Sequence, residues 1–271
     1  MNTPSSMRML SLAAGIAAVL SLASLASAQA SLPLVERFNY PAGNLTGNTI
    51  NGGTWTQTGS NAATPVQVAA GSLSYSGLPA SVGNKVVLLN GSGYEDPGLD
   101  ITPTTSTVYA SFILNVVNPG NTTGDYFFNF SSAGSTSIDF KARVYVRQGS
   151  AAGTYNIGLR GDSGAASPQV WSSDITVGSP IFVVVAYQFN TATNDDMTYV
   201  WLNPPLGQAS PVSADLSSVV GTDIAAALGR VNLRQGSAST SMNLELDELR
   251  VSTSWQDVTP SNASVGDWSL Y

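Results

Sequence analysis

The sequence predicts an all-β protein whose strands form a single antiparallel sandwich. Across residues 31–256, short β-branched and aromatic runs alternate with Gly, Asn, Pro and Ser, and helical spacing is almost absent. Segment 138–147 alternates most clearly, with apolar residues at even positions and largely polar ones at odd positions. About 240 residues follow residue 30, a length that one large sandwich can absorb.

Residues 1–30 have the three parts of an export signal. Arg8 precedes an apolar run from Leu10 to Leu25, which is short for a bilayer span and ends in small residues that suit a signal peptidase. A retained membrane anchor is the alternative, but neither a stop-transfer pattern nor a cluster of basic residues supports it. We therefore expect a secreted protein, extracellular, at the cell surface or periplasmic, with no membrane span once the signal is cleaved.

Each predicted strand is a short run of β-branched or aromatic residues bounded by turn formers. In chain order these runs are 34–40, 54–58, 72–76, 85–89, 108–117, 126–130, 138–147, 155–160, 181–189, 198–203, 231–234 and 243–251. Segments 108–117 and 181–189 are apolar at both parities, as is typical of central strands covered on each side. One helical turn is expected at 223–228, ended by Gly229, and residues 257–271 form a polar, irregular tail.

The last predicted strand changes the parity of its apolar residues. Leu246 is the last apolar residue at an even position, and Leu249 is the first at an odd one. A regular strand cannot bury both sets on one face. A β-bulge at Asp247 and Glu248 would restore the register and redirect both carboxylates, and a bend at a sheet corner is the alternative.

Composition excludes several classes of function. Without Arg8 the chain has nine basic and seventeen acidic residues, so its formal charge is 9 − 17 = −8, and we expect no nucleic-acid partner. The chain has no cysteine, so thiol and disulfide chemistry are excluded. It also has no histidine, which removes the commonest general base and the usual zinc and copper ligands. Catalysis would have to use carboxylates, Tyr, Ser, Thr, Lys or Arg.

Several short sequence blocks, spread over nearly the whole chain after the leader, together form a characteristic order. They are FNYPAG at 38–43, Trp55, GSLSYSGL at 71–78, VGN at 82–84, VYASF at 108–112, GDYFF at 124–128, ARVYV at 142–146, LRQG at 233–236, and LDELRV at 246–251 with Trp255. Together they resemble a largely uncharacterised group of secreted bacterial domains, similar to the LamG and concanavalin A-like lectin/glucanase superfamily. The resemblance implies a jelly roll of two antiparallel sheets, and it implies no particular ligand.

Glu36 and Asp247 are the candidate metal ligands. Their segments resemble two edge segments that meet in the superfamily's glucanases, where such a pairing often holds a structural calcium ion. Calcium takes several oxygen ligands, which carboxylates and strand-end carbonyls supply. The alternative is a solvated network in which Glu36, Asp247 and Glu248 pair with Arg37 and Arg250.

No catalytic residue is assigned. Superfamily glucanases place three acids at alternate positions of an inner strand, whereas here only Glu245 and Asp247 alternate and Glu248 has the wrong parity. A lyase could instead use a tyrosine with Arg or Lys on the polar face of the 138–147 strand. The alternative is that this face is only a solvated sheet surface.

Carbohydrate recognition requires an aromatic ring on which a sugar can stack and a few polar partners. The candidate ligand-binding residues are Trp55, Tyr94, Arg143, Tyr145, Arg147 and Trp171. Each aromatic residue among them could instead belong to the core.

Two further motifs have simpler explanations. Arg160-Gly161-Asp162 spells an adhesion tripeptide, which we attribute to a glycine turn. The acidic turn 194–196 is a possible second cation or sugar contact, but Asn and Asp are ordinary turn formers. The resulting hypothesis is a non-catalytic secreted sandwich that recognises a polysaccharide or a cell-surface glycan. A polysaccharide-degrading enzyme and a structural surface or matrix protein are the alternatives.

Overall fold

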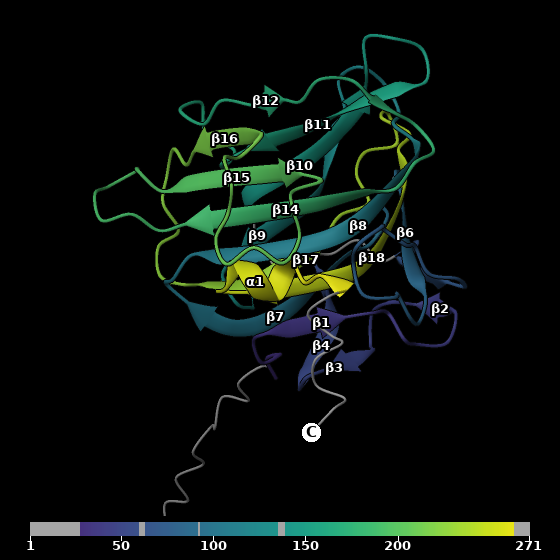
Figure 1. The fold of residues 1–271 in the computed structure, drawn as a ribbon, viewed down its shortest axis with the longest axis horizontal. Coiled ribbons are helices and arrows are strands. Elements are labelled where there is room, and N and C mark those ends of the chain that lie inside the picture. The colour runs from purple at the N-terminus through teal and green to yellow at the C-terminus, as the bar shows by residue number, and fades with distance from the viewer. Residues whose placement is uncertain (1–27, 60–62, 92, 135–138, 263–271) are drawn as a thin grey trace, which may run out of the picture.

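The computed structural model describes residues 28–59, 63–91, 93–134 and 139–262. Two nine-stranded antiparallel sheets pack face to face, which confirms the predicted all-β jelly-roll sandwich (Figure 1). In the described part of the chain, no helix is long and apolar enough to cross a membrane. The predicted export signal lies outside the described residues except for residues 28–30.

The first sheet has the strand order β16-β15-β14-β8-β18-β6-β5-β2, and β1 pairs with β18 beside this path. Its strands are β1 (Leu34–Glu36), β2 (Gly43–Asn44), β5 (Gln67–Ala69), β6 (Lys85–Leu89), β8 (Val108–Asn118), β14 (Ile181–Gln188), β15 (Met197–Leu202), β16 (Leu216–Val219) and β18 (Asn243–Ser252). The two strands predicted to be central, β8 and β14, are paired neighbours inside this sheet. That prediction is confirmed.

The second sheet has the strand order β12-β11-β10-β9-β17-β7-β4-β3, and β13 pairs with β11. Its strands are β3 (Thr49–Ile50), β4 (Gly53–Thr58), β7 (Asp96–Thr104), β9 (Asp125–Ser131), β10 (Lys141–Gln148), β11 (Thr154–Arg160), β12 (Val170–Trp171), β13 (Ile175–Thr176) and β17 (Leu228–Leu233). Strands far apart in the chain, such as β9 and β17, are direct neighbours. This crossing of distant strands is what makes the sandwich a jelly roll.

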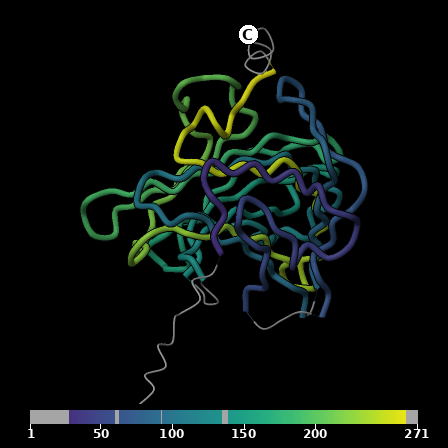
Figure 2. Tube along the Cα trace, turned by 90° about the horizontal axis from the view of Figure 1, so that it is seen from below, coloured from purple at the N-terminus to yellow at the C-terminus, as the bar shows by residue number. Residues whose placement is uncertain are grey.

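The two sheets differ in what covers their outer faces. The main core lies between them and includes Phe112 of the first sheet and Phe128 of the second. A second apolar layer covers the outer face of the first sheet, where helix α1 (Trp255–Val258) packs over β8 and β18. The outer face of the second sheet is polar. Figure 2 shows the first described residues, in purple, and the last ones, in yellow, leaving the sandwich on opposite sides.

Strand β18 tests two predictions, the bulge at Asp247 and Glu248 and the meeting of the first and last predicted strands. Its register shifts between Asp247 and Arg250, and Glu248 has a positive φ of 52°. The predicted bulge at Asp247 and Glu248 is therefore confirmed. β1 pairs with β18 through Leu34 and Val251, so the two segments expected to meet do so.

The predicted helical turn at 223–228 is wrong. Leu228 already begins β17 and pairs with Thr104, and the backbone N–H of Ile224 donates to the Tyr187 hydroxyl. The Asp223 carboxylate accepts backbone N–H groups of another loop rather than those of its own segment. A long-range contact therefore replaces the local cap on which the prediction rested. The tail predicted from residue 257 also contains part of α1, whose Val258 is buried.

Candidate functional site

The polar outer face of the second sheet carries a group of arginines and aromatic rings, here called the arginine–aromatic face. Its residues are Tyr126, Arg143, Tyr145, Arg147, Trp171 and Arg234. Strand β10 places three of them, Arg143, Tyr145 and Arg147, because Val144 and Val146 enter the core and the alternate side chains point outward. The predicted alternation is confirmed from Arg143 onward. A bulge at Ala142, which has a φ of 50°, breaks it before that point, and Ile138 lies outside the described residues.

The rings form a row across neighbouring strands. Tyr126 lies opposite Tyr145, with ring centroids 5.5 Å apart. Tyr145 then meets Trp171 edge-on at 6.1 Å. Gly158, opposite Tyr145 on β11, makes this contact possible, since a Cβ there would lie 2.7 Å from the Trp171 ring. Tyr145, in the middle of the row, is only 8% exposed, whereas Tyr126 and Trp171 are half-buried. The two outer rings are therefore the ones on which flat apolar faces of a ligand can stack.

Each of three guanidinium groups lies over one of these rings. Arg143 is 4.8 Å from the centroid of Tyr126, and Arg234 is 4.1 Å from the same centroid on another approach. Arg147 lies 4.1 Å from the centroid of Trp171. These are cation–π distances, so positive charge and aromatic surface alternate along the face.

Arg234 is paired within the protein. Its guanidinium contacts Asp125 at 2.6 Å and Asp96 at 3.8 Å. Burial raises the pKa of Asp96 to about 6, although the nearby Arg234 acts in the opposite direction. Burial likewise raises the pKa of Tyr126. Arg234 therefore orients the end of the ring row, and its charge is already neutralised.

Arg143 and Arg147 differ from Arg234, because no described carboxylate lies within ion-pair distance of either guanidinium. Arg147 donates from Nε to the Asn156 side chain at 3.0 Å. Arg143 is only 9% exposed, and its buried Nε has no hydrogen-bond partner among the described residues. The face thus holds two cations that the protein leaves without an anion.

A groove of about 580 Å³ opens beside Arg147 and is lined also by Thr122, Ser172 and Asp174. Asp174 holds its rim by accepting hydrogen bonds from Ser150 and from other donors of the 149–156 hairpin. These hydrogen bonds, led by those from Ser150, hold the pKa of Asp174 well below its usual range. The groove therefore has a rim tied together by several hydrogen bonds, next to Trp171.

Further along the same sheet, a buried ion pair links β17 to β7. Arg230 contacts Asp100 at 2.7 Å, and each side chain is almost fully buried. Arg230 also donates to Thr56 and Thr58 of β4. The pair therefore ties three strands together and belongs to the scaffold of the face.

The structure brings together four of the six predicted ligand-binding residues, namely Arg143, Tyr145, Arg147 and Trp171. Trp55 is wrong as a stacking residue, because its ring is fully buried against Phe38 in the core. Tyr94 is half-buried in a loop before β7, over Gly91, and is not part of the arginine–aromatic face. Sequence analysis missed Tyr126 and Arg234, whose proximity depends on strand pairing.

The two predicted metal ligands serve as hydrogen-bond acceptors inside the fold. Glu36 is 1% exposed and accepts from Phe38 N at 2.7 Å, Tyr40 Oη at 2.7 Å and Trp55 Nε1 at 2.9 Å. Asp247 is fully buried and accepts from two backbone N–H groups. The geometry gives both a structural role, and calcium binding by them stays a prediction.

The alternative network of Glu36, Asp247 and Glu248 with Arg37 and Arg250 forms only around Glu248, because the described contacts of Glu36 and Asp247 include neither arginine. Glu248 contacts Arg250 at 2.9 Å and Arg37 at 3.8 Å. The expectation of a solvated network is wrong, because the bulge turns Glu248 inward and leaves Arg250 buried beside it.

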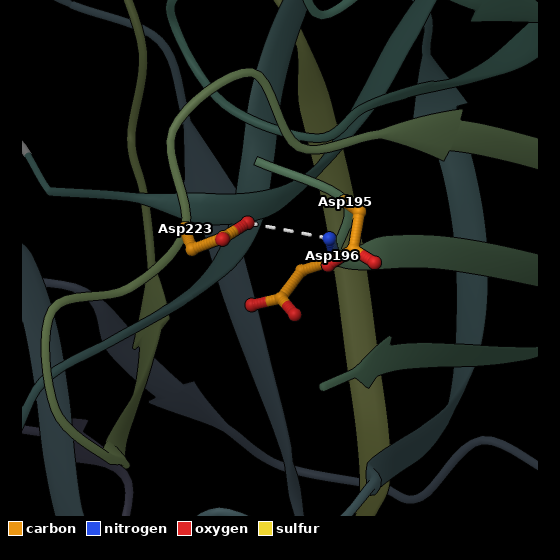
Figure 3. A group of neighbouring side chains, drawn as sticks. All are labelled: Asp195, Asp196 and Asp223. Atoms are coloured by element: carbon orange, nitrogen blue, oxygen red, sulfur yellow. Dashed lines mark hydrogen bonds between the residues drawn. The ribbon is translucent and has the colours of Figure 1, made fainter. Parts of the chain in front are cut away.

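An acidic cluster lies at the turn before β15. One oxygen from each of Asp195, Asp196 and Asp223 falls within 4.8 Å of the others, so the three could hold a metal ion (Figure 3). All three carboxylates also accept hydrogen bonds: Asp195 from the backbone of Ala192 at 3.3 Å, Asp196 from the Tyr187 hydroxyl, and Asp223 from the backbone of Asp196 at 3.2 Å. Hydrogen bonds already explain much of this geometry. Asp223 could not be assigned from sequence, because it joins the turn from a distant loop.

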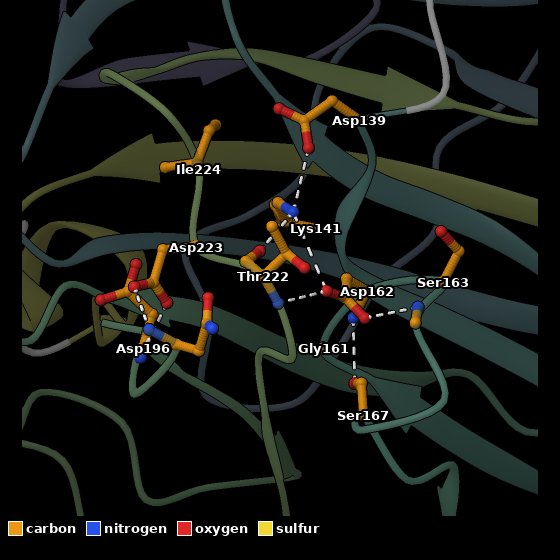
Figure 4. A network of polar contacts seen from close by, with 12 residues as sticks. Asp139, Lys141, Gly161, Asp162, Ser163, Ser167, Asp196, Thr222, Asp223 and Ile224 are labelled. Atoms are coloured by element: carbon orange, nitrogen blue, oxygen red, sulfur yellow. Dashed lines mark hydrogen bonds and ion pairs between the residues drawn. The ribbon is translucent and has the colours of Figure 1, made fainter. Parts of the chain in front are cut away.

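A second polar network holds the side chains of Lys141 and Asp162 inside the protein (Figure 4). Lys141 contacts Asp139 at 2.9 Å and Asp162 at 4.0 Å, and it donates to the Thr222 carbonyl at 2.6 Å. Asp162 is 3% exposed and accepts from the backbone of Gly164 and Thr222. Lys141 is thus occupied internally. The Arg160-Gly161-Asp162 tripeptide does not present its carboxylate, as expected.

No family model matches the sequence, and no curated protein matches it. Solved structures with a similar arrangement of strands include an alginate lyase from Alteromonas sp. 272, with a TM-score of 0.39, 9% identity, and coverage of 65% of this chain and 90% of that one. A glycosyl hydrolase family protein from Mycobacterium fortuitum has a TM-score of 0.42 and 10% identity, with coverage of 80% of this chain and 98% of that one. A pentraxin from Limulus polyphemus has a TM-score of 0.39 and 16% identity, with coverage of 69% of this chain and 75% of that one. At these identities the similarity concerns the fold alone.

Proposed function

We propose that this chain is a secreted, non-catalytic polysaccharide-binding sandwich that holds its ligand on the arginine–aromatic face. The observation that carries the proposal is the row of rings from Tyr126 through Tyr145 to Trp171, next to a groove of about 580 Å³. Pyranose rings stack on aromatic side chains, and neighbouring polar groups orient them. An extended sugar chain fits a row of this kind better than a single small molecule does.

The acids near the face support binding rather than hydrolysis. Glycoside hydrolysis requires two carboxyl groups on either side of the scissile bond. Asp96 and Asp125 are engaged with Arg234, and Asp174 is held by the hairpin donors. Among the described residues of this face, no two carboxylates are free to act as such a pair.

A lyase is the second candidate function, because Tyr145 lies between Arg143 and Arg147 on one strand face. A tyrosine that exchanges a proton beside a guanidinium is the minimum such chemistry requires. The same binding experiment separates the two candidates when reaction products are measured alongside retention.

The test uses purified residues 29–271 and affinity gels that contain soluble polysaccharides. Retention is expected on at least one polymer, and Trp171→Ala should weaken it by roughly tenfold through loss of stacking and of the Arg147 contact. Trp171→Phe should restore part of it. Tyr94→Ala is the matched control, since it removes a half-buried ring outside the face and should leave retention unchanged.

Each other outcome has a defined meaning. Unsaturated sugar ends would overturn the non-catalytic proposal in favour of a lyase, and new reducing ends would indicate a hydrolase. Retention that disappears with chelator and returns with calcium would assign a structural calcium ion, with the Asp195 cluster as the first place to examine. No retention on a broad panel would reject the proposal and favour a structural role.

A further inference from the structure

Arg143 is the most unusual side chain of the arginine–aromatic face. It is 9% exposed, donates no hydrogen bond and pairs with no carboxylate in the part of the chain that the structure describes. The buried Nε has lost water without gaining an acceptor, which is costly. The rings of Tyr126, at 4.8 Å, and Phe140, at 5.7 Å, offset only part of that cost.

Three other arginines on or next to strands of the second sheet show how this protein satisfies a guanidinium group. Arg230 and Arg234 each contact an aspartate, and Arg160 donates to the carbonyls of Ser167 and Gly164. Arg143 lies directly opposite Arg160 in the β10–β11 register. Like charges that face each other across strands destabilise a sheet. The protein therefore concentrates positive potential at Arg143 although its overall formal charge is −7.

We infer that the ligand is an acidic polysaccharide, and that Arg143 binds one of its carboxylate or sulfate groups. The inference rests on the proposed glycan binding and adds the charge class of the ligand. The guanidinium fork matches the oxygens of such groups and forms charge-assisted hydrogen bonds with them. A ligand anion at Arg143 would supply the partner that the fold does not.

Arg147 extends the inference to a polymer. It lies four residues along β10 from Arg143, a distance of about 13 Å on the same strand face, and it also lacks a carboxylate partner among the described residues. Tyr145 lies between the two guanidinium groups. A polymer that repeats an anion on successive sugars can contact both arginines and stack on the half-buried Trp171 beside Arg147, whereas a single acidic sugar cannot reach both arginines.

The experiment compares four polymers on residues 29–271, namely a polyuronate, the same polyuronate after reduction of its carboxyl groups, a sulfated glycan and a neutral glycan. The polyuronate is expected to bind at least about tenfold more tightly than its reduced form, with an affinity that falls as salt is added. Binding of the sulfated polymer alone would assign sulfate as the anion.

Arg143→Gln separates ligand binding from folding. We expect it to lower affinity for the acidic polymer at least about tenfold and to leave the unfolding midpoint unchanged or raised, because it removes a buried, unpaired charge. Arg143→Lys keeps the charge without the guanidinium fork, so its affinity for the acidic polymer should lie between those of the parent and of Arg143→Gln. Arg37→Gln, on a side chain 43% exposed just after β1, changes net charge equally and is the control.

Three results would overturn the inference. Equal affinity for the reduced and the acidic polymer would show that charge is not recognised, and the proposed glycan binding would still stand. Unchanged affinity in Arg143→Gln would place the anion elsewhere, and a large loss of stability would show that Arg143 has a structural role. If none of the four polymers is retained at all, the proposed function itself fails.

Discussion

Replacing Asp247 with asparagine should remove a pH dependence of stability that arises from the bulge in β18. The Asp247 carboxylate is fully buried and accepts from Leu73 N at 2.8 Å and Glu248 N at 2.7 Å. Burial raises its pKa from the ordinary 3.8 to about 7, although the two hydrogen bonds oppose the rise. The Leu73 contact also ties the loop that precedes β6 to the sheet.

The sign and size follow from this raised pKa. Because the folded chain holds the Asp247 proton more tightly than the unfolded chain, the contribution is fully present below about pH 4 and is lost as pH rises to about 7. Each pKa unit corresponds to about 1.4 kcal/mol, so a rise of about three units gives at most about 4 kcal/mol. The asparagine in Asp247→Asn has no proton to lose, and its amide leaves one backbone donor unpaired at a pH-independent cost of about 1–3 kcal/mol.

The assay is urea unfolding followed by tryptophan fluorescence at several pH values from about 4 to about 8. The variant should be less stable than the parent in acid, and the difference in unfolding free energy should move by several kcal/mol in its favour as pH rises, mostly above about pH 5. Asp215→Asn is the control, since Asp215 is exposed and accepts one backbone N–H of Leu202. A difference between Asp247→Asn and the parent that stays constant over this range would refute the reasoning.

Three further predictions concern the scaffold of the arginine–aromatic face. Arg230→Met should destabilise the chain by about 3–5 kcal/mol in urea unfolding by leaving Asp100 buried and unpaired, and Asp100→Leu in the same chain should recover much of the loss; no recovery would contradict the ion-pair explanation. Asp174 has a lowered pKa, so its contribution is present above its ordinary pKa and lost in acid; Asp174→Asn should speed amide exchange in the hairpin at neutral pH, with the gap closing as pH falls. Gly158→Ala would place a methyl group 2.7 Å from the indole of Trp171 and should weaken glycan retention without unfolding the protein; unchanged retention would show that the position of this ring is unimportant.

Local pattern accounted for much of the fold. The runs at 108–117 and 181–189 were apolar at both parities, and they form the paired central strands β8 and β14. The change of parity between Leu246 and Leu249 located the bulge at Asp247 and Glu248. Both inferences use neighbouring residues only, because side-chain direction alternates with a period of two along a strand.

The candidate site was predictable only where it lies on one strand. Arg143, Tyr145 and Arg147 share the outer face of β10 by their parity. Tyr126 and Arg234 come from β9 and the end of β17, and their proximity depends on a register that the sequence does not specify. Trp55 showed the reverse failure, since an aromatic residue beside glycines has the same local pattern whether it faces solvent or the core.

Residue order was enough to establish an all-β chain, its central strands, the bulge in its last strand and the absence of cysteine and histidine chemistry. It was not enough to establish which charges are neutralised. In the folded chain Arg234 meets Asp125, Lys141 meets Asp139 and Asp162, and Arg143 meets no described carboxylate. Strand parity is a local property, whereas the pairing of charges depends on contacts between segments that are brought together only when the sheets close on each other.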